Sequence, residues 1–177
     1  LDPSKIDLII ISTDTPEFIS PSTASVVQHR LGADNAGTFD INTACAGFVT
    51  ALDIAAKYII SDAQYKHILV IGAYAMSKFL NKKDKKTVTL FADGAGAVIL
   101  KATNSKKKGF RGSELISKGE YNGYMGIYGG GTKFPINKDM LKSHEHQLQF
   151  ISKFPKELNP EIWTSMAKRL CKRNKIT

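Results

Sequence analysis

Cysteine is scarce in this sequence, and long hydrophobic runs are missing. The 177 residues contain two cysteines, Cys45 and Cys171, which are too few and too far apart to suggest a disulfide framework. We therefore expect reduced thiols in an intracellular, cytoplasmic protein. The longest uninterrupted apolar stretches, such as residues 8–11, are far shorter than the roughly 20 residues that span a bilayer. A membrane-spanning protein is not expected.

The chain also lacks an initiating methionine and a secretory signal. It opens with Leu1-Asp2-Pro3-Ser4, without a basic segment followed by a hydrophobic one. We expect it to be an internal piece of a longer protein. No repeat or low-complexity tract is visible, and 42% apolar residues suffice for a buried core. With 23% charged residues, this composition argues against disordered and collagen-like classes.

The net charge of +9 comes largely from lysines at 78–108 and from a basic C-terminal group. Such clusters could attract an anionic partner, and the alternative is a solvated lysine-rich surface. No alternation of aromatic and basic residues accompanies the charge. The sequence therefore disfavours nucleic-acid binding.

The hydrophobic patterns of the first hundred residues alternate between strands and helices. A helix capped by Ser22 or Thr23 should end at Gly32, and a largely buried helix with a narrow polar face should follow over 46–61. Short apolar runs predict strands over 6–12, 38–41, 67–72, 87–91 and 95–100. This alternation indicates an α/β layered fold.

Beyond residue 102 the patterns are weaker. Residues 103–140 are polar and glycine-rich, which predicts loops and short strands. Helical patterns return over 141–152 and 159–173. In the second of these, Asn159 is expected to cap the helix and Pro160 to take its first position.

Cys45 stands where a short strand should give way to the buried helix. Free N–H groups and the helix dipole favour an anion there, so we expect a larger thiolate fraction than for a free thiol of pKa about 8.5. A thiolate attacks thioesters. Ala44, Ala46 and Gly47 leave room for a substrate carbonyl, and the Cys45 N–H could donate to its oxyanion. On this spacing alone, an inert buried cysteine is the alternative.

Three segments in order resemble the β-ketoacyl-acyl-carrier-protein synthase III family of thiolase-like condensing enzymes. Asp40-Ile-Asn-Thr-Ala-Cys-Ala-Gly-Phe48 is similar to its nucleophile motif, and Leu90-Phe-Ala-Asp-Gly-Ala-Gly-Ala-Val98 to its glycine-rich strand motif. The third segment is Ser20-Pro-Ser22, which precedes a helix as the corresponding family segment does. Gly129-Gly130-Gly131 is a modest further match.

The resemblance implies a thiolase-like α-β-α-β-α sandwich, usually dimeric, of which this chain covers only part. Residues 1–102 would belong to the N-terminal half with the nucleophile, and 103–177 would be a loop-rich extension and helices leading toward the C-terminal half. It implies acyl transfer from acyl-CoA to Cys45, then decarboxylating condensation with malonyl-acyl-carrier protein in fatty-acid synthesis. A histidine and an asparagine from the later half would assist that step, and no cofactor is implied. The isolated 177 residues should acylate poorly and should not condense.

The same resemblance suggests residues for the substrate pocket. Met76 and Phe91 are similar to positions that line the acyl pocket, with core packing as the alternative. Ser20 stands where family members may place a phenylalanine contributed across the dimer, and Asp14 where a small hydroxyl residue is common. Lys85 stands where the family has an arginine near the mouth of the coenzyme A site. Lysine keeps the positive charge but lacks the planar guanidinium group.

The remaining candidates have simpler interpretations. His144 and His146 are two residues apart, a spacing that metal ligands can have. Because no further ligand is placed nearby, we expect an exposed pair of histidines and assign no metal site. Asp93 is expected to bond loop N–H groups. Two functional alternatives remain: a thiolase-like acyltransferase of secondary metabolism, and a non-catalytic truncated or split subunit.

Overall fold

The computed structural model of the chain describes residues 1–105 and 109–176. The chain divides into two compact units. The first comprises Leu1–Tyr74 and Gly94–Gly112, and the second Ala75–Asp93 and Ser113–Thr177. The division at residue 102 that the sequence suggested stays a prediction.

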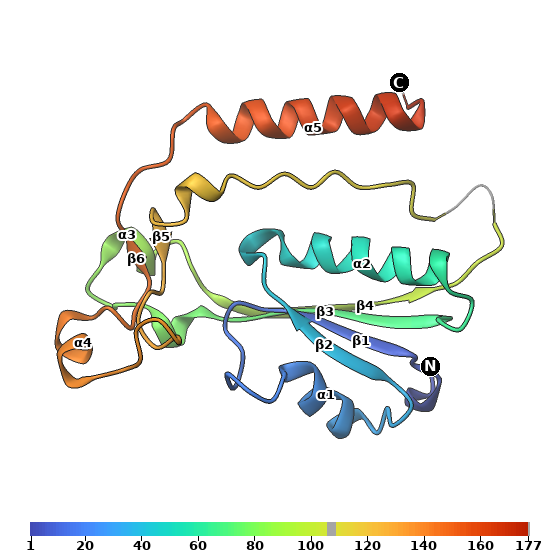
Figure 1. Cartoon of the computed structure of the whole chain (residues 1–177), viewed down its shortest axis with the longest axis horizontal. Helices are drawn as coiled ribbons and strands as arrows, with labels where there is room; N and C mark the ends of the chain where they lie inside the picture. Colours follow the sequence, from blue (N-terminus) through green and yellow to red (C-terminus); the bar gives the residue numbers. More distant parts are fainter. Residues whose placement is uncertain (106–108, 177) are drawn as a thin grey trace. The chain divides into compact units, whose positions relative to one another are not determined.

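A four-stranded sheet forms the body of the first unit (Figure 1). Its strands lie in the order β2-β1-β3-β4, with bounds β1 Leu8–Ser12, β2 Gly37–Ile41, β3 His67–Ala75 and β4 Asp93–Lys101. Strand β1 is parallel to both neighbours, and Ser12 lies opposite Ile41 on one side and Gly72 on the other. The carboxyl ends of β2, β1 and β3 therefore meet at one edge.

Helices cover the two faces of this sheet: α1 (Thr23–Leu31) lies on one face and α2 (Gly47–Ser61) on the other (Figure 1). Because strand side chains alternate between faces, Ile9 and Ile11 cluster with Ala24 of α1, while Ile10 clusters with Ala55 of α2. The branched residues of β1 are thus buried on both sides. The layered α/β organisation predicted from the sequence is confirmed.

Helix α1 begins and ends as its sequence predicts. Ser22 Oγ accepts a hydrogen bond from Ser25 N–H at 3.2 Å, and Gly32 closes the helix in the left-handed region with φ 65°. A second cap was not foreseen. The Asp40 carboxylate, on β2, accepts from the N–H groups of Thr23 (2.6 Å) and Ala24 (2.8 Å). These bonds fasten the helix start to the sheet.

The predicted burial of the second helix is only half right. Ala51 and Ala55 are fully buried against the sheet, but Val49 is 64% exposed and Ile60 72% exposed on the opposite side. The helical stretch Ala44–Ser61 is long and apolar enough to cross a membrane by length and composition alone. Here its buried face packs on a sheet, as in the core helix of a globular domain.

The second unit is built from short elements. These are η3 Met76–Phe79, α3 Lys85–Val88, η4 Gly119–Tyr121, β5 Met125–Gly126, α4 Lys138–Ser143, β6 Gln149–Phe150 and α5 Leu158–Asn174; η1 Pro3–Lys5 and η2 Ala44–Ala46 belong to the first unit. Strands β5 and β6 pair in antiparallel fashion. The expected loops and short strands over 103–140 agree with η4 and β5, apart from 106–108, which lie outside the described residues.

Three predictions for this part of the chain were wrong. Residues 87–91 are not a strand, because Asp84 caps α3 by accepting from Lys86 N–H at 2.9 Å. Residues 141–152 are not one helix: Asn137 starts α4 early, and His144 ends it in the left-handed region. The last helix begins at Leu158, so Asn159 lies inside it and does not cap it.

Candidate functional site

Cys45 lies exposed at the start of α2, in the short helix η2 that leads directly into it. It follows β2 by four residues, so it stands at the edge where the carboxyl ends of the parallel strands meet. The predicted junction of strand and helix is confirmed. The alternative of a cysteine packed in the core does not hold, because the side chain is accessible.

Polar side chains fix the turn that presents Cys45. Asn42 Oδ1 accepts from Ala44 N–H at 3.0 Å. Thr43 Oγ1 donates to Thr50 Oγ1 at 3.1 Å, and Thr50 Oγ1 donates to the Ala46 carbonyl at 3.0 Å. The Cys45 N–H itself donates to no acceptor within residues 1–105 and 109–176. It is available to an oxyanion beside the sulfur.

The small residues around Cys45 have distinct roles. Ala44 has a φ of 46°, a left-handed conformation that costs a non-glycine residue about 1–2 kcal/mol. Gly47 cannot carry a side chain without rearrangement, because a Cβ there would lie 1.8 Å from Ser12 Oγ. The start of α2 is thus seated directly on the end of β1. Backbone strain such as that of Ala44 is concentrated at functional sites.

Asp14 and Tyr74 share this edge of the sheet with Cys45. Burial raises the pKa of the Asp14 carboxyl above its ordinary value. Burial, followed by the negative charges of Asp14 and Cys45, raises the pKa of Tyr74 to about 12. Sequence reasoning had named Asp14 but missed Tyr74. Its place two residues beyond Gly72, near the end of strand β3, was the available signal.

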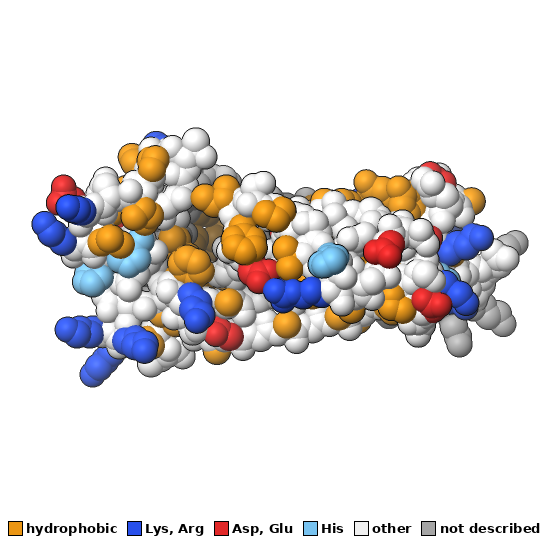
Figure 2. Space-filling view, turned by 90° about the horizontal axis from the view of Figure 1, so that it is seen from below, with side chains coloured by type: hydrophobic (Ala, Val, Ile, Leu, Met, Phe, Trp, Pro, Cys, Tyr) orange, Lys and Arg blue, Asp and Glu red, His pale blue; other side chains and the backbone are white. Residues whose placement is uncertain are grey.

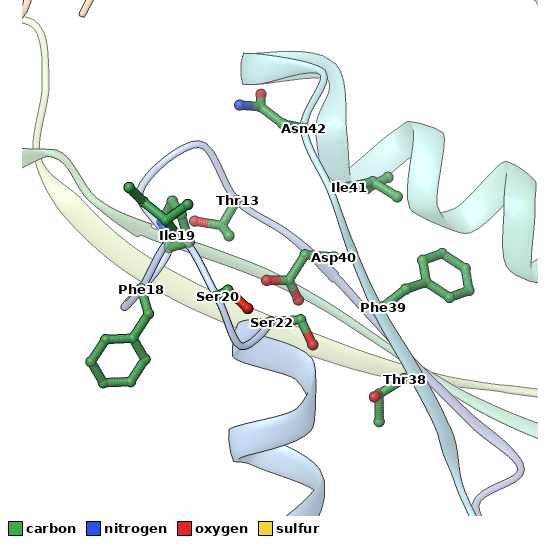
Figure 3. Close-up of a pocket in the computed structure, with 11 residues that line it drawn as sticks. Thr13, Phe18, Ile19, Ser20, Ser22, Thr38, Phe39, Asp40, Ile41 and Asn42 are labelled. Atoms are coloured by element: carbon green, nitrogen blue, oxygen red, sulfur yellow. The ribbon is translucent and has the colours of Figure 1, made fainter. Parts of the chain in front are cut away.

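A cavity of about 380 Å³ opens between the end of β2 and the loop before α1 (Figure 3). Ser20, a predicted pocket residue, lines it together with Phe18, Ile19 and Asn42. Asp40 points from β2 toward Ser22 and α1, whereas Phe39 and Ile41 point to the α2 side (Figure 3). Figure 2 views the side that carries α1 and shows hydrophobic side chains at the surface among polar ones.

The other predicted residues lie in the second unit. Met76 is 2% exposed at the start of η3, Phe91 is half-buried after α3, and Lys85 is the exposed first residue of α3. Asp93 accepts from Ser77 N–H (2.8 Å) and Oγ (2.6 Å), which holds the pKa of its carboxyl below the ordinary value. The predicted loop-bonding role of Asp93 is confirmed.

The histidine pair does not form a ligand cluster. Its rings lie 6.2 Å apart, and Nδ1 of His146 lies 3.3 Å from the Met140 carbonyl oxygen. Within the part of the chain that the structure describes, no three histidine, cysteine or acidic side chains gather as metal ligands.

Sequence comparison shows that the nucleophile segment is similar to a known family. Residues 39–119 match the family model of 3-oxoacyl-[acyl-carrier-protein (ACP)] synthase III. The β-ketoacyl-[acyl-carrier-protein] synthase III of Caldanaerobacter subterraneus subsp. tengcongensis is 39% identical over 84% of this chain and 44% of its own length. That of Aliarcobacter butzleri is 35% identical over 98% of this chain and 52% of its own. The chain spans about half the length of these curated relatives.

Solved structures give the same fold. The 3-oxoacyl-[acyl-carrier-protein] synthase III of Aquifex aeolicus superposes with a TM-score of 0.80 at 28% identity, covering all of this chain and 52% of that one. The priming β-ketosynthase of the R1128 polyketide biosynthetic pathway superposes with a TM-score of 0.69 at 30% identity, over 85% of this chain and 43% of that one. The thiolase-like fold class predicted from the sequence is confirmed for the part present here.

Proposed function

We propose that this chain belongs to the β-ketoacyl-[acyl-carrier-protein] synthase III family and that it supplies the acyl-accepting nucleophile Cys45 of a condensing enzyme. The observation that carries the proposal is the exposed thiol at the start of α2, beside an unpaired backbone N–H. A buried or distant thiol could not receive an acyl group.

The acylation step uses features of the first unit alone. Cys45 attacks the thioester carbonyl of an acyl-CoA as its thiolate, the nucleophilic form of a cysteine. The Cys45 N–H donates to the developing oxyanion. The bond from the acyl carbon to the coenzyme sulfur then breaks and the new bond to Sγ remains. The leaving coenzyme thiolate takes up one proton from solvent, which balances the proton that the Cys45 thiol lost before the attack.

Condensation requires groups that we do not assign to this chain. In the whole protein, malonyl-acyl-carrier protein would lose carbon dioxide and its carbanion would attack the Cys45 thioester. None of His29, His67, His144 and His146 stands in a motif similar to the family's catalytic histidine. We expect a histidine and an asparagine of the later half to act here, in a cytoplasmic homodimer. Met76 and Phe91 would line the acyl pocket. Lys85 would lie near the entrance of the coenzyme A site.

Mass spectrometry of the whole protein after incubation with acetyl-CoA tests the acylation step. We expect one acetyl adduct on the peptide that contains Cys45, lost in Cys45→Ser and kept in Cys171→Ser. Cys171 is the matched control because it is also an exposed free thiol. Equal labelling of both cysteines, or of neither, would contradict the proposal.

A second candidate is a condensing enzyme of secondary metabolism. The observation that favours it is the similarity to the priming β-ketosynthase of a polyketide pathway, at 30% identity. Acylation of Cys45 by a series of acyl-CoA chain lengths would separate the two. Preference for acetyl-CoA supports fatty-acid initiation, and preference for a longer or branched acyl group supports the second candidate.

A third candidate is a non-catalytic split subunit that folds onto another chain. Strand β4 favours it, since Val98 and Ile99 are 41% and 45% exposed and an uncovered strand edge invites pairing. Size-exclusion chromatography of the 177 residues tests it. A monodisperse monomer would count against this candidate.

A further inference from the structure

The face on which Tyr74 lies follows from the pairing of β3. Ile68 and Val70 pack in the cluster beneath α2. Gly72 continues this face, because a Cβ there would lie 3.2 Å from the Phe48 ring of α2. Strand side chains repeat every second residue, so Tyr74 is the next side chain on the α2 face. It comes near η2, the short helix that carries Cys45 and leads into α2.

Asp14 approaches the same place from β1. Ser12 Oγ lies beneath Gly47 at the start of α2, and Asp14 follows Ser12 by two residues. Both Asp14 and Tyr74 are half-buried. The charges of Asp14 and Cys45 both act on the Tyr74 hydroxyl and raise its pKa. Three strand ends thus bring a carboxyl, a phenol and a thiol together.

Neither polar group is satisfied by the protein around it. In the described ranges 1–105 and 109–176, the Tyr74 hydroxyl has no hydrogen-bond partner, and the Asp14 carboxylate accepts only from its own backbone N–H. A plain alkyl chain lying against them would remove water and offer no hydrogen bond in return. Leaving buried polar groups unpaired is unfavourable.

We propose that Tyr74 and Asp14 are specificity-determining residues of the Cys45 site, and that they favour a short acyl group bearing a hydroxyl over a plain alkyl group. The hydroxyl would accept from Tyr74 and donate to Asp14, replacing the water that each loses. This inference rests on the proposed role of Cys45 as the acyl acceptor.

The test compares two small thioesters on the whole protein, the N-acetylcysteamine esters of 3-hydroxybutyrate and of butyrate. In each reaction Cys45 Sγ bonds to the acyl carbon, the bond to the cysteamine sulfur breaks, and the released thiolate is protonated. Peptide mass spectrometry over time gives the acylation rate of each cysteine. We expect the hydroxybutyryl ester to acylate Cys45 about tenfold faster, the value of one or two good hydrogen bonds.

Variants and an internal control separate specificity from reactivity. Tyr74→Phe keeps the ring and removes the hydroxyl, and Asp14→Ala removes the carboxylate; each should bring the rate ratio toward one. Tyr65→Phe, whose ring packs against Tyr58 instead, should leave the ratio unchanged. Cys171 should show no preference between the esters.

The outcomes also distinguish this inference from the proposed function. Acylation of Cys45 by both esters at equal rates, unaffected by Tyr74→Phe, would overturn the specificity role and leave the nucleophile role intact. No acylation of Cys45 by either ester would overturn both.

Discussion

Gly47 and Ser12 approach so closely that a Cβ on Gly47 would lie 1.8 Å from Ser12 Oγ and 3.1 Å from Ser12 Cβ. Gly47 is the first residue of α2, and Ser12 the last of β1. The contact fixes the distance between the nucleophile turn and the sheet. It explains why a glycine stands two residues after Cys45.

Gly47→Ala should therefore destabilise the protein. Overpacking costs about 1–3 kcal/mol, which exceeds the gain of about 0.5–1 kcal/mol from replacing a helical glycine by alanine. The midpoint of urea unfolding measures the change. Gly96→Ala is the matched control, since nothing lies within 4 Å of its Cβ position. Adding Ser12→Ala to Gly47→Ala should recover part of the loss, and a double variant no better than Gly47→Ala would contradict the contact.

Asp40→Ala should loosen α1 from β2. The carboxylate accepts two backbone N–H groups, at 2.6 and 2.8 Å, so its removal leaves both donors without this partner, at a cost of about 1–3 kcal/mol. Hydrogen exchange of the Thr23 and Ala24 amides should accelerate together with the loss of stability. Asp34→Ala is the control, because this exposed carboxylate has no partner in the part of the chain described here. Unchanged exchange in Asp40→Ala would exclude the cap.

Tyr74 should make the folded protein sensitive to alkali. Its pKa is about 12, against an ordinary value of 10.0. Because the folded state holds this proton more tightly, its contribution to stability is complete below pH 10 and is lost as pH rises toward 12. Tyrosinate absorbance of the wild type minus that of Tyr74→Phe should show one group that ionises near pH 12. A difference titration centred at pH 10 would show that Tyr74 is not buried beside Asp14.

Asp93 should make the stability of the folded protein depend on pH in the acidic range. Its hydrogen bonds to Ser77 lower the pKa of its carboxyl from the ordinary 3.8. The stabilisation is therefore present above pH 3.8 and is lost as pH falls through the lower folded value. Carboxyl chemical shifts followed by NMR should show the pKa of Asp93 rise toward 3.8 in Ser77→Ala. A titration identical to that of the wild type would mean that these bonds do not form in solution.

The sequence could predict the parts of the fold whose local signals agree with their packing. Strand β1 is branched and apolar at successive positions, and α1 has both a serine cap and a terminal glycine; both were found as expected. The predictions failed where a capping side chain, and not the hydrophobic pattern, determines where a helix begins, as at Asp84 and Asn137. Cys45 could be found because its neighbours are small and its motif is specific. Tyr74 and the Asp40 cap depend on which strands are neighbours, which hydrophobic periodicity does not encode.

Helix α2 is buried on one side only. Val49 and Ile60 are 64% and 72% exposed, whereas Ala55 on the opposite side is fully buried. Val49→Lys and Ile60→Lys should change the free energy of unfolding of the 177 residues by no more than about 0.5 kcal/mol, as surface substitutions do. Ala55→Leu, which adds volume to a packed site, should cost about 1–3 kcal/mol. Urea unfolding of the three variants measures this. If the two lysine variants were as unstable as Ala55→Leu, the outer side of α2 would have to be buried in this chain.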